Sequence, residues 1–240
     1  MKEELFSESL SVKEMAYKNI KYKIVSGKIK PGVWLKEEEL SKMMNISRPP
    51  IREALNLLER EGFVRLFPRK GVIVSQITEK EIEDIYQLRE VLELFLIKKY
   101  FNEISKEKII KLKNEFKKIL DEKILDENLR MQYLNLSKQF HEAINEPCEN
   151  EKIVNIIKNN LEKIHWFCAF SKLRESFKDS ILENLGIIEA IENGDKELAV
   201  KRMKEHYIKA KKSLIKEINT ILQNTNDIVP KFYKSKINWK

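Results

Sequence analysis

The sequence predicts a mainly α-helical protein with an N-terminal winged helix-turn-helix domain and a C-terminal all-α helical bundle. Three observations predict this fold class. Apolar residues recur at helical spacing along most of the 240-residue chain. The chain holds only six glycines and six prolines, which leaves little room for sheet. The one stretch of strand-like composition, within residues 63–74, follows two short helical segments that a tight turn separates.

The first domain opens with a helix and a turn. Ser11 begins a capping box, and the apolar helical stripe behind it ends at Gly27. Pro31-Gly32 then predicts a turn. A second helix is expected over residues 36–44, because the asparagine and serine that follow favour turns and caps over helix interiors.

The helix after this turn is the expected recognition helix. Ser47 is a good N-cap, and Arg48-Pro49-Pro50 can open a helix because proline is tolerated in a first turn. Gly62 ends the helix. Arg48 and Arg52 are four residues apart, hence on one face, in the turns that meet base edges and phosphates. They are the leading candidate DNA contacts.

A hairpin with a basic tip follows this helix. Residues 63–66 and 72–74 have strand composition, and the turn that joins them carries Arg69 and Lys70 at its tip. Such a hairpin is a wing that can touch the DNA backbone or minor groove. Arginine pairs on helices are mostly solvated surface charge, and helix-turn-helix patterns also occur in proteins that bind no DNA. The arginines, wing and glycines in register together favour DNA binding.

The charge distribution agrees with a DNA-binding N-terminal domain. Residues 1–80 hold 16 Lys and Arg against 11 Asp and Glu, a net charge of +5 out of a formal +8 for the whole chain. The basic excess therefore leans toward the helix-turn-helix end.

Cysteine usage and hydropathy indicate the compartment. The two cysteines suggest neither a disulfide framework nor a zinc site. The chain has no apolar run of the kind that a signal peptide or membrane span needs. A cytoplasmic protein without membrane contact is therefore expected.

Residues after 76 predict helices throughout, and so a helical bundle. A capping box of Thr78 with Glu81 opens the first helix. We therefore expect domains at residues 1–76 and 77–222, followed by a basic C-terminal tail at 223–240. The expected helices are residues 79–101, 106–121, 127–144, 150–172, 175–193 and 195–222.

The bundle carries polar residues where the helical periodicity demands apolar ones. Arg89 lies at the centre of the first stripe, and Ser137 and His141 lie one turn apart in a later stripe. Asn184 and His206 interrupt two further stripes. Burying such a group unpaired costs about 1–3 kcal/mol, so these side chains should face one another, water or a ligand. Inward-facing polar groups from several helices predict a cavity.

Three motifs occur together in the first third of the chain: Ser47-Arg48-x-Pro50-Ile51-Arg52-Glu53-Ala54-Leu55, Leu58-Glu59-x-Glu61-Gly62, and a basic turn with Gly71 before an apolar strand. Together they resemble the DNA-binding domain of GntR-family bacterial transcription regulators. One departure is Glu38, which stands where the family often has a basic DNA-contacting residue. The expected DNA-binding residues are Ser47, Arg48, Pro50, Arg52, Arg69, Lys70 and Gly71.

The second domain carries Tyr86-x-x-Arg89-x-x-x-Glu93, Phe140-His141, Ser180-x-x-Glu183-Asn184-x-x-Ile187 and Ala199-x-x-x-Met203-x-x-His206. These motifs resemble the FCD ligand-binding domain of the FadR-like branch of the GntR family. The resemblance implies a helical bundle that senses small organic acids. Such domains often hold a divalent metal through one Asp and three His.

The residue-by-residue match keeps only half of that metal site. His141 and His206 match two of the histidines, whereas Ser137 and Asn184 stand at the positions of the Asp and the remaining His. Divalent ions favour an anionic carboxylate among their ligands, so neutral Ser and Asn weaken the site. No cofactor is therefore expected, and a divalent metal of the Zn, Ni or Mn class at His141 and His206 stays as an alternative.

Two metal-free interpretations remain for these inward polar residues. In one, Arg89 holds an effector carboxylate with its planar fork, and the other polar residues complete the pocket. In the other, the histidines are satisfied core residues and Arg89 forms an internal ion pair with Glu93 or Glu142. The expected effector-binding residues are Arg89, Ser137, His141, Asn184 and His206.

The sequence thus predicts a non-enzymatic, homodimeric transcription regulator, such as a repressor. It would bind a double-stranded DNA operator with an affinity controlled by a small, carboxylate-bearing effector. One alternative is a constitutive DNA-binding regulator with a structural, ligand-free bundle. The other is a helical metalloenzyme, which would need a carboxylate base near His141 and His206.

Overall fold

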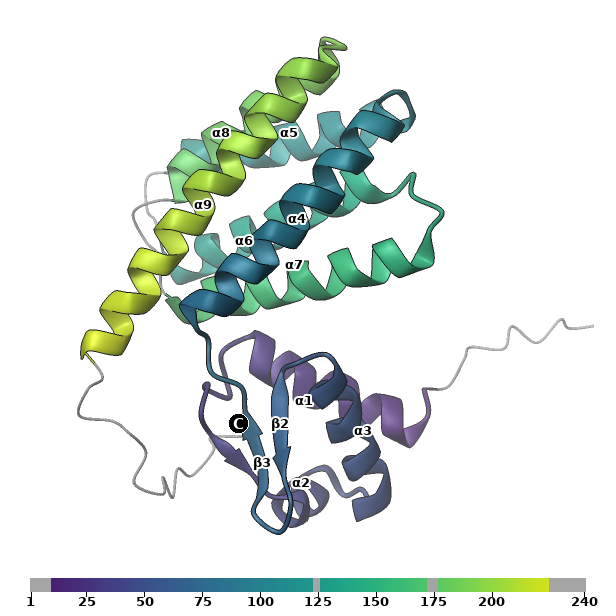
Figure 1. Cartoon of the computed structure of the whole chain (residues 1–240), viewed down its shortest axis with the longest axis vertical. Coiled ribbons are helices and arrows are strands. Elements are labelled where there is room, and N and C mark those ends of the chain that lie inside the picture. The colour runs from purple at the N-terminus through teal and green to yellow at the C-terminus, as the bar shows by residue number, and fades with distance from the viewer. Residues whose placement is uncertain (1–9, 123–125, 172–176, 225–240) are drawn as a thin grey trace, which may run out of the picture. The chain divides into compact units, whose positions relative to one another are not determined.

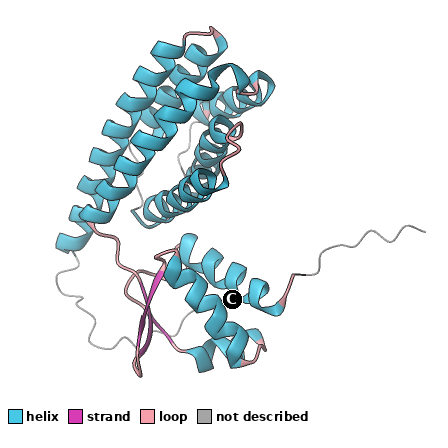
Figure 2. Cartoon of the chain, turned by 45° about the vertical axis from the view of Figure 1, so that its right-hand side comes forward, coloured by secondary structure: helices cyan, strands magenta, loops and turns pink. Residues whose placement is uncertain are grey.

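The computed structural model describes residues 10–122, 126–171 and 177–224. The chain divides into two compact units, and the boundary between them in the sequence lies between Gln76 and Ile77. The first unit has helices and a small antiparallel sheet, and the described part of the second unit is helical (Figures 1 and 2). The predicted fold class is therefore confirmed. Residues 225–240, most of the predicted tail, lie outside the described part.

The first unit is a winged helix-turn-helix. Its strands form one antiparallel sheet in the order β1-β3-β2, and β2 and β3 are the predicted wing hairpin. The sequence did not predict β1, because two residues are too short to show an alternating pattern. The elements are α1 Val12–Val25, β1 Trp34–Leu35, α2 Glu37–Met44, α3 Arg48–Arg60, β2 Val64–Phe67 and β3 Gly71–Val74.

Local chemistry explains where these helices begin and end. The capping box at Ser11 forms, since its side chain accepts from the Glu14 backbone N–H while the Glu14 carboxylate accepts from Ser11. Asn45 ends α2 in the left-handed conformation at φ 52°, which asparagine tolerates better than most residues. The buried face of α3 consists of Ile51, Ala54, Leu55 and Leu58, as its periodicity predicts.

Ser47 differs from its expected role in one respect. It occupies the N-cap position of α3 with extended backbone angles, but its side chain makes no capping hydrogen bond. A capping hydroxyl accepts from the second or third backbone N–H of the helix. Here those positions are Pro49 and Pro50, which have no N–H. The exposed Ser47 hydroxyl is therefore left without this partner.

The second unit packs its helices around an apolar interior. α4 packs along α9, α9 against α8, and α5 against both α6 and α8 (Figure 1). The helix bounds agree with the predicted ranges to within about two residues at most ends. None of the helices in the described ranges has the length and hydrophobicity needed to cross a membrane. The helices are α4 Glu79–Tyr100, α5 Lys106–Asp121, α6 Glu127–Asn145, α7 Glu151–Ser171, α8 Phe177–Glu192 and α9 Lys196–Asn224.

Candidate functional site

The two candidate DNA-reading arginines lie at the start of α3 and pair with glutamates of α2. The Arg52 guanidinium donates to both carboxylate oxygens of Glu37, with Nη2 to Oε2 at 2.7 Å. Arg48 Nη2 lies 3.3 Å from Glu38 Oε2. Both arginine side chains are about 60% exposed (59% and 62%). The glutamates therefore orient the arginines while leaving them accessible.

Two more predicted DNA contacts, Ser47 and Pro50, lie at the start of α3, and the wing carries the remaining three. Arg69 and Lys70 are exposed at its tip, where Arg69 adopts a left-handed conformation at φ 62° and the Lys70 N–H closes the turn on Phe67 O. Gly71 follows with φ 110°, a value that side-chain-bearing residues rarely adopt. The wing geometry therefore explains why a glycine stands at residue 71.

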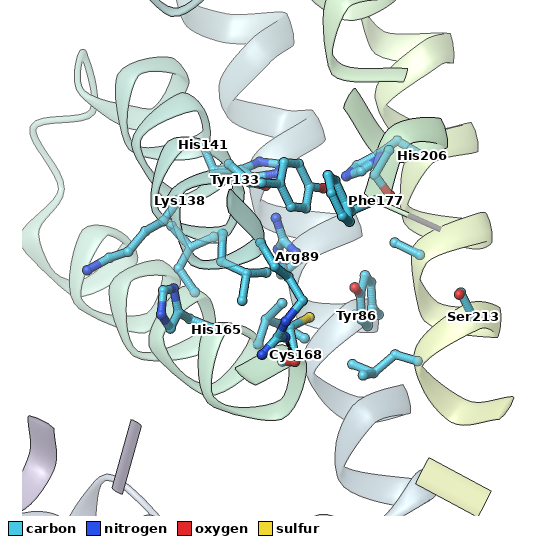
Figure 3. A pocket seen from close by; sticks show the side chains of 18 residues that line it. Tyr86, Arg89, Tyr133, Lys138, His141, His165, Cys168, Phe177, His206 and Ser213 are labelled. Atoms are coloured by element: carbon cyan, nitrogen blue, oxygen red, sulfur yellow. Dashed lines mark hydrogen bonds between the residues drawn. The ribbon is translucent and has the colours of Figure 1, made fainter. Parts of the chain in front are cut away.

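A cavity of about 90 Å³ lies inside the second unit, lined by side chains of α4, α6, α7, α8 and α9 (Figure 3). Four of the five predicted effector residues line it: Arg89, Ser137, His141 and His206. The fifth, Asn184, is not among the lining residues. It is fully buried on α8, and neither its amide nitrogen nor its amide oxygen has a hydrogen-bond partner.

Arg89 is held at the cavity by a buried ion pair. Its Nε donates to Glu93 Oε1 at 2.7 Å, and both side chains are almost fully buried. Glu93 Oε2 also accepts from His141 Nδ1 at 3.0 Å and from Asn145 Nδ2 at 3.2 Å. Burial alone would raise the pKa of Glu93, but the Arg89 guanidinium and His141 hold this pKa well below its usual range. The carboxylate is therefore ionised.

Part of the Arg89 guanidinium has no hydrogen-bond partner. Its Nη2 is buried without a hydrogen-bond partner. The guanidinium also lies over the ring of Tyr207, 4.7 Å from the centroid, and over that of Tyr86, at 5.5 Å. The predicted ion pair with Glu93 thus forms, while Glu142 is instead 3.6 Å from Lys138. Because the pair leaves Nη2 unsatisfied, Arg89 can still bind an anion.

Comparison with known proteins identifies the family. The family model described as bacterial regulatory proteins of the gntR family matches residues 12–74. The FCD domain model matches residues 84–209, more than half of the chain. The chain belongs to the GntR family of transcriptional regulators that carry an FCD domain.

Individual GntR proteins resemble this one over most of their length. The gluconate operon transcriptional repressor of Bacillus licheniformis is 33% identical over 202 residues, 78% of this chain and 79% of that protein. The structure of E. coli McbR/YncC matches with a TM-score of 0.70 at 18% identity, over 91% of this chain and 100% of that one. A GntR regulator from Rhodococcus sp. RHA1 matches with a TM-score of 0.71 at 17% identity, over 86% and 99%. At such identities the structural matches show the fold alone.

The donor set of this GntR protein does not fit a tight divalent metal site. Among the described residues, no group of three or more His, Cys, Asp or Glu side chains is arranged to hold a metal ion. The rings of His141 and His206 stack with centroids 5.9 Å apart, but the nearby Ser137 is neutral. The Nδ1 atoms of His141 and His206 already lie 3.0 and 2.8 Å from the carboxylates of Glu93 and Glu183.

Two of the cavity histidines are uncharged at neutral pH. Burial and the nearby Arg89 guanidinium lower the pKa of His141 to about 4. Burial and Lys138 lower the pKa of His165 to about 4. Since a carboxylate can only accept, His141 Nδ1 carries its proton, and its Nε2 is left as an acceptor. A ligand hydroxyl can donate to such a nitrogen.

Sequence reasoning missed several lining residues. Arg130 precedes Ser137 by seven residues on the same helical stripe, so extending that stripe by one turn toward the N-terminus finds it. Its guanidinium donates to the backbone carbonyl oxygens of Cys168 and Ala169. His165, on α7, also lines the cavity. The other missed residues include Tyr86, Tyr133, Cys168, Phe177 and Ser180.

Proposed function

We propose that this GntR regulator is a repressor whose operator affinity is controlled by a small carboxylate bound in the cavity of the second unit. Residues 1–76 would bind DNA, and residues 77–222 would bind the effector and form a homodimer. The protein would act in the cytoplasm without catalytic activity. The observation that carries this proposal is the buried, unpartnered Nη2 of Arg89 at a cavity that the three histidines of the chain all line.

The chemistry of the cavity favours an anion that also carries hydroxyl groups. Arg89, Arg130 and Lys138 line it, while no Asp or Glu is among the residues that line it. A carboxylate oxygen can accept from Arg89 Nη2, and hydroxyls can donate to the free ring nitrogen of His141. The similarity to the gluconate operon repressor makes a sugar acid the first effector to test. A metal-free pocket accounts for this binding with the residues present.

Effector control would follow from a population shift. A carboxylate that binds one arrangement of the units better than another favours that arrangement. DNA affinity then changes by the coupling free energy between the two sites. Ser47, Arg48, Pro50, Arg52, Arg69, Lys70 and Gly71 are the residues that we propose at the DNA interface.

Thermal unfolding of the full chain with gluconate and a panel of other carboxylates tests this function. At 100 times its dissociation constant, a ligand adds about 2.7 kcal/mol of stability, a rise of several degrees in melting temperature. The matched variant is Arg89→Lys, which keeps a positive charge beside Glu93 but removes the planar fork. We expect the shift to disappear in Arg89→Lys. An acid that shifts both proteins equally would contradict the role of Arg89.

One observation favours a second candidate function. Glu93 already satisfies the charge of Arg89, so the bundle is able to fold as a ligand-free, structural element. The protein would then be a constitutive DNA-binding regulator. Operator binding that no carboxylate changes, together with unchanged melting temperatures across the panel, would support this alternative.

A row of exposed apolar side chains on α4 supports dimerisation. Leu88, Val91 and Phe95 are 45%, 63% and 49% exposed and recur at helical spacing on one face. Large exposed apolar patches mark interaction sites, and helix-turn-helix proteins commonly bind two half-sites as dimers. We expect Val91→Glu to convert the dimer to a monomer in light scattering, with Ile110→Glu, on α5, as the control.

A further inference from the structure

A second hollow lies between α5, α6 and α7, on residues other than Arg89 and the histidines. Its volume is about 510 Å³. Val154, Ile157 and Leu161 of α7 give it an apolar wall. Asn145, at the end of α6, gives it a buried polar group. We call this hollow the α5–α7 groove.

One of the two polar side-chain atoms of Asn145 has no hydrogen-bond partner. The side chain is 5% exposed, and its Nδ2 donates to Glu93 Oε2 at 3.2 Å. This bond fixes the orientation of the amide, because an ionised carboxylate only accepts. Asn145 Oδ1 is then buried without a hydrogen-bond partner. An unsatisfied buried acceptor is unfavourable, and a ligand O–H or N–H would relieve it.

The charges around the groove balance, unlike those of the cavity at Arg89. Lys108 and Lys158 line the groove together with Glu142 and Glu146. Lys108 pairs with Glu146, and Lys138 lies near Glu142. The two lysines and two glutamates of the lining therefore sum to zero formal charge.

We propose that the α5–α7 groove binds an uncharged small molecule that donates an O–H or N–H to Asn145 Oδ1. The apolar body of this ligand covers Val154, Ile157 and Leu161. The proposed ligand does not depend on the carboxylate site. Leu161 lines both hollows, and Glu93, which lines neither, binds Asn145 on one side and Arg89 on the other.

Two aromatic amides test the donor requirement on the full chain. Benzamide has an N–H donor, and N,N-dimethylbenzamide has the same aromatic ring without a donor. We expect benzamide to bind about tenfold more tightly in an NMR titration, because only benzamide can satisfy Asn145 Oδ1. Equal affinities, or no binding of benzamide up to its solubility limit, would overturn the proposal.

Two matched variants test the location without disturbing Asn145. Val154→Phe fills the groove from its half-buried wall, and Ile110→Phe adds a ring at an exposed position of α5 outside the lining. We expect Val154→Phe to weaken benzamide binding by at least about tenfold and Ile110→Phe to leave it unchanged. Benzamide binding that survives Val154→Phe would overturn the proposal. The melting shift with gluconate should persist in Val154→Phe, so failure of one site is distinguishable from failure of the other.

Discussion

Arginine–glutamate pairs occur in both units of this GntR regulator at similar distances but in opposite environments. On the first unit, Arg52 lies 2.7 Å from Glu37, and the arginine side chain is 62% exposed. In the bundle, Arg89 also lies 2.7 Å from Glu93, yet the two side chains are only 3% and 0% exposed. Distance alone therefore does not distinguish the pairs.

Exposure decides what each pair can do. An exposed ion pair contributes about 0–1 kcal/mol, so DNA can replace Glu37 as the partner of Arg52 at little cost. Removing one member of a buried pair leaves an uncompensated charge and costs about 3–5 kcal/mol. Arg89 is therefore a fixed part of the cavity wall, and its unpartnered Nη2 is available to a ligand.

The largest expected effect is on the buried pair. Glu93→Gln keeps the shape of the side chain but leaves the Arg89 guanidinium without its counter-charge. We expect the free energy of unfolding in urea to fall by about 3–5 kcal/mol. Glu37→Gln is the matched control in the exposed pair, and it should change stability by less than about 1 kcal/mol. Similar losses in both variants would contradict the difference between the two environments.

The next effect is on DNA binding by the exposed pairs. Arg48→Ala and Arg52→Ala should each weaken operator binding by about 1–3 kcal/mol, because base-reading contacts are lost. The loss on an unrelated duplex should be smaller, and stability should barely change. Fluorescence anisotropy with a duplex obtained by in vitro selection measures both affinities. Arg60→Ala, in the last turn of the same helix, is the control. Equal losses on both duplexes would mean that these arginines contact phosphate only.

Local patterns made most of the first unit predictable from sequence. The buried face of α3, the wing and the left-handed Asn45 follow from periodicity and turn chemistry. Ser47 occupies the predicted N-cap position but makes no capping bond, because the N-cap preference does not include which backbone N–H groups the next residues supply. The pairing of Arg52 with Glu37 joins two helices across the turn, and periodicity within one helix does not predict it.

The cavity was predictable only in part, because periodicity within one helix does not predict contacts between helices. Arg89, Ser137 and His141 interrupt apolar stripes, so each could be found on its own helix. Which residues meet at the cavity depends on the rotation and crossing of five helices, and a single stripe does not contain that information. Asn184 interrupts its stripe in the same way but is not part of the lining. His165 lines the cavity without any marked interruption of a stripe.

The smallest expected effect is the loss of folding stability at low pH that the buried His165 causes. His165 has a pKa of about 4 in the folded protein, against an ordinary value near 6.5 in the unfolded chain. Between these values the unfolded chain binds a proton that the folded protein does not, so acid favours unfolding. From pH 7 to pH 5 this histidine should cost the wild-type protein about 1–2 kcal/mol of stability. Urea unfolding at both pH values should therefore show a smaller loss in His165→Gln. The same loss in both proteins would mean that His165 accepts a proton in the folded cavity as readily as in water.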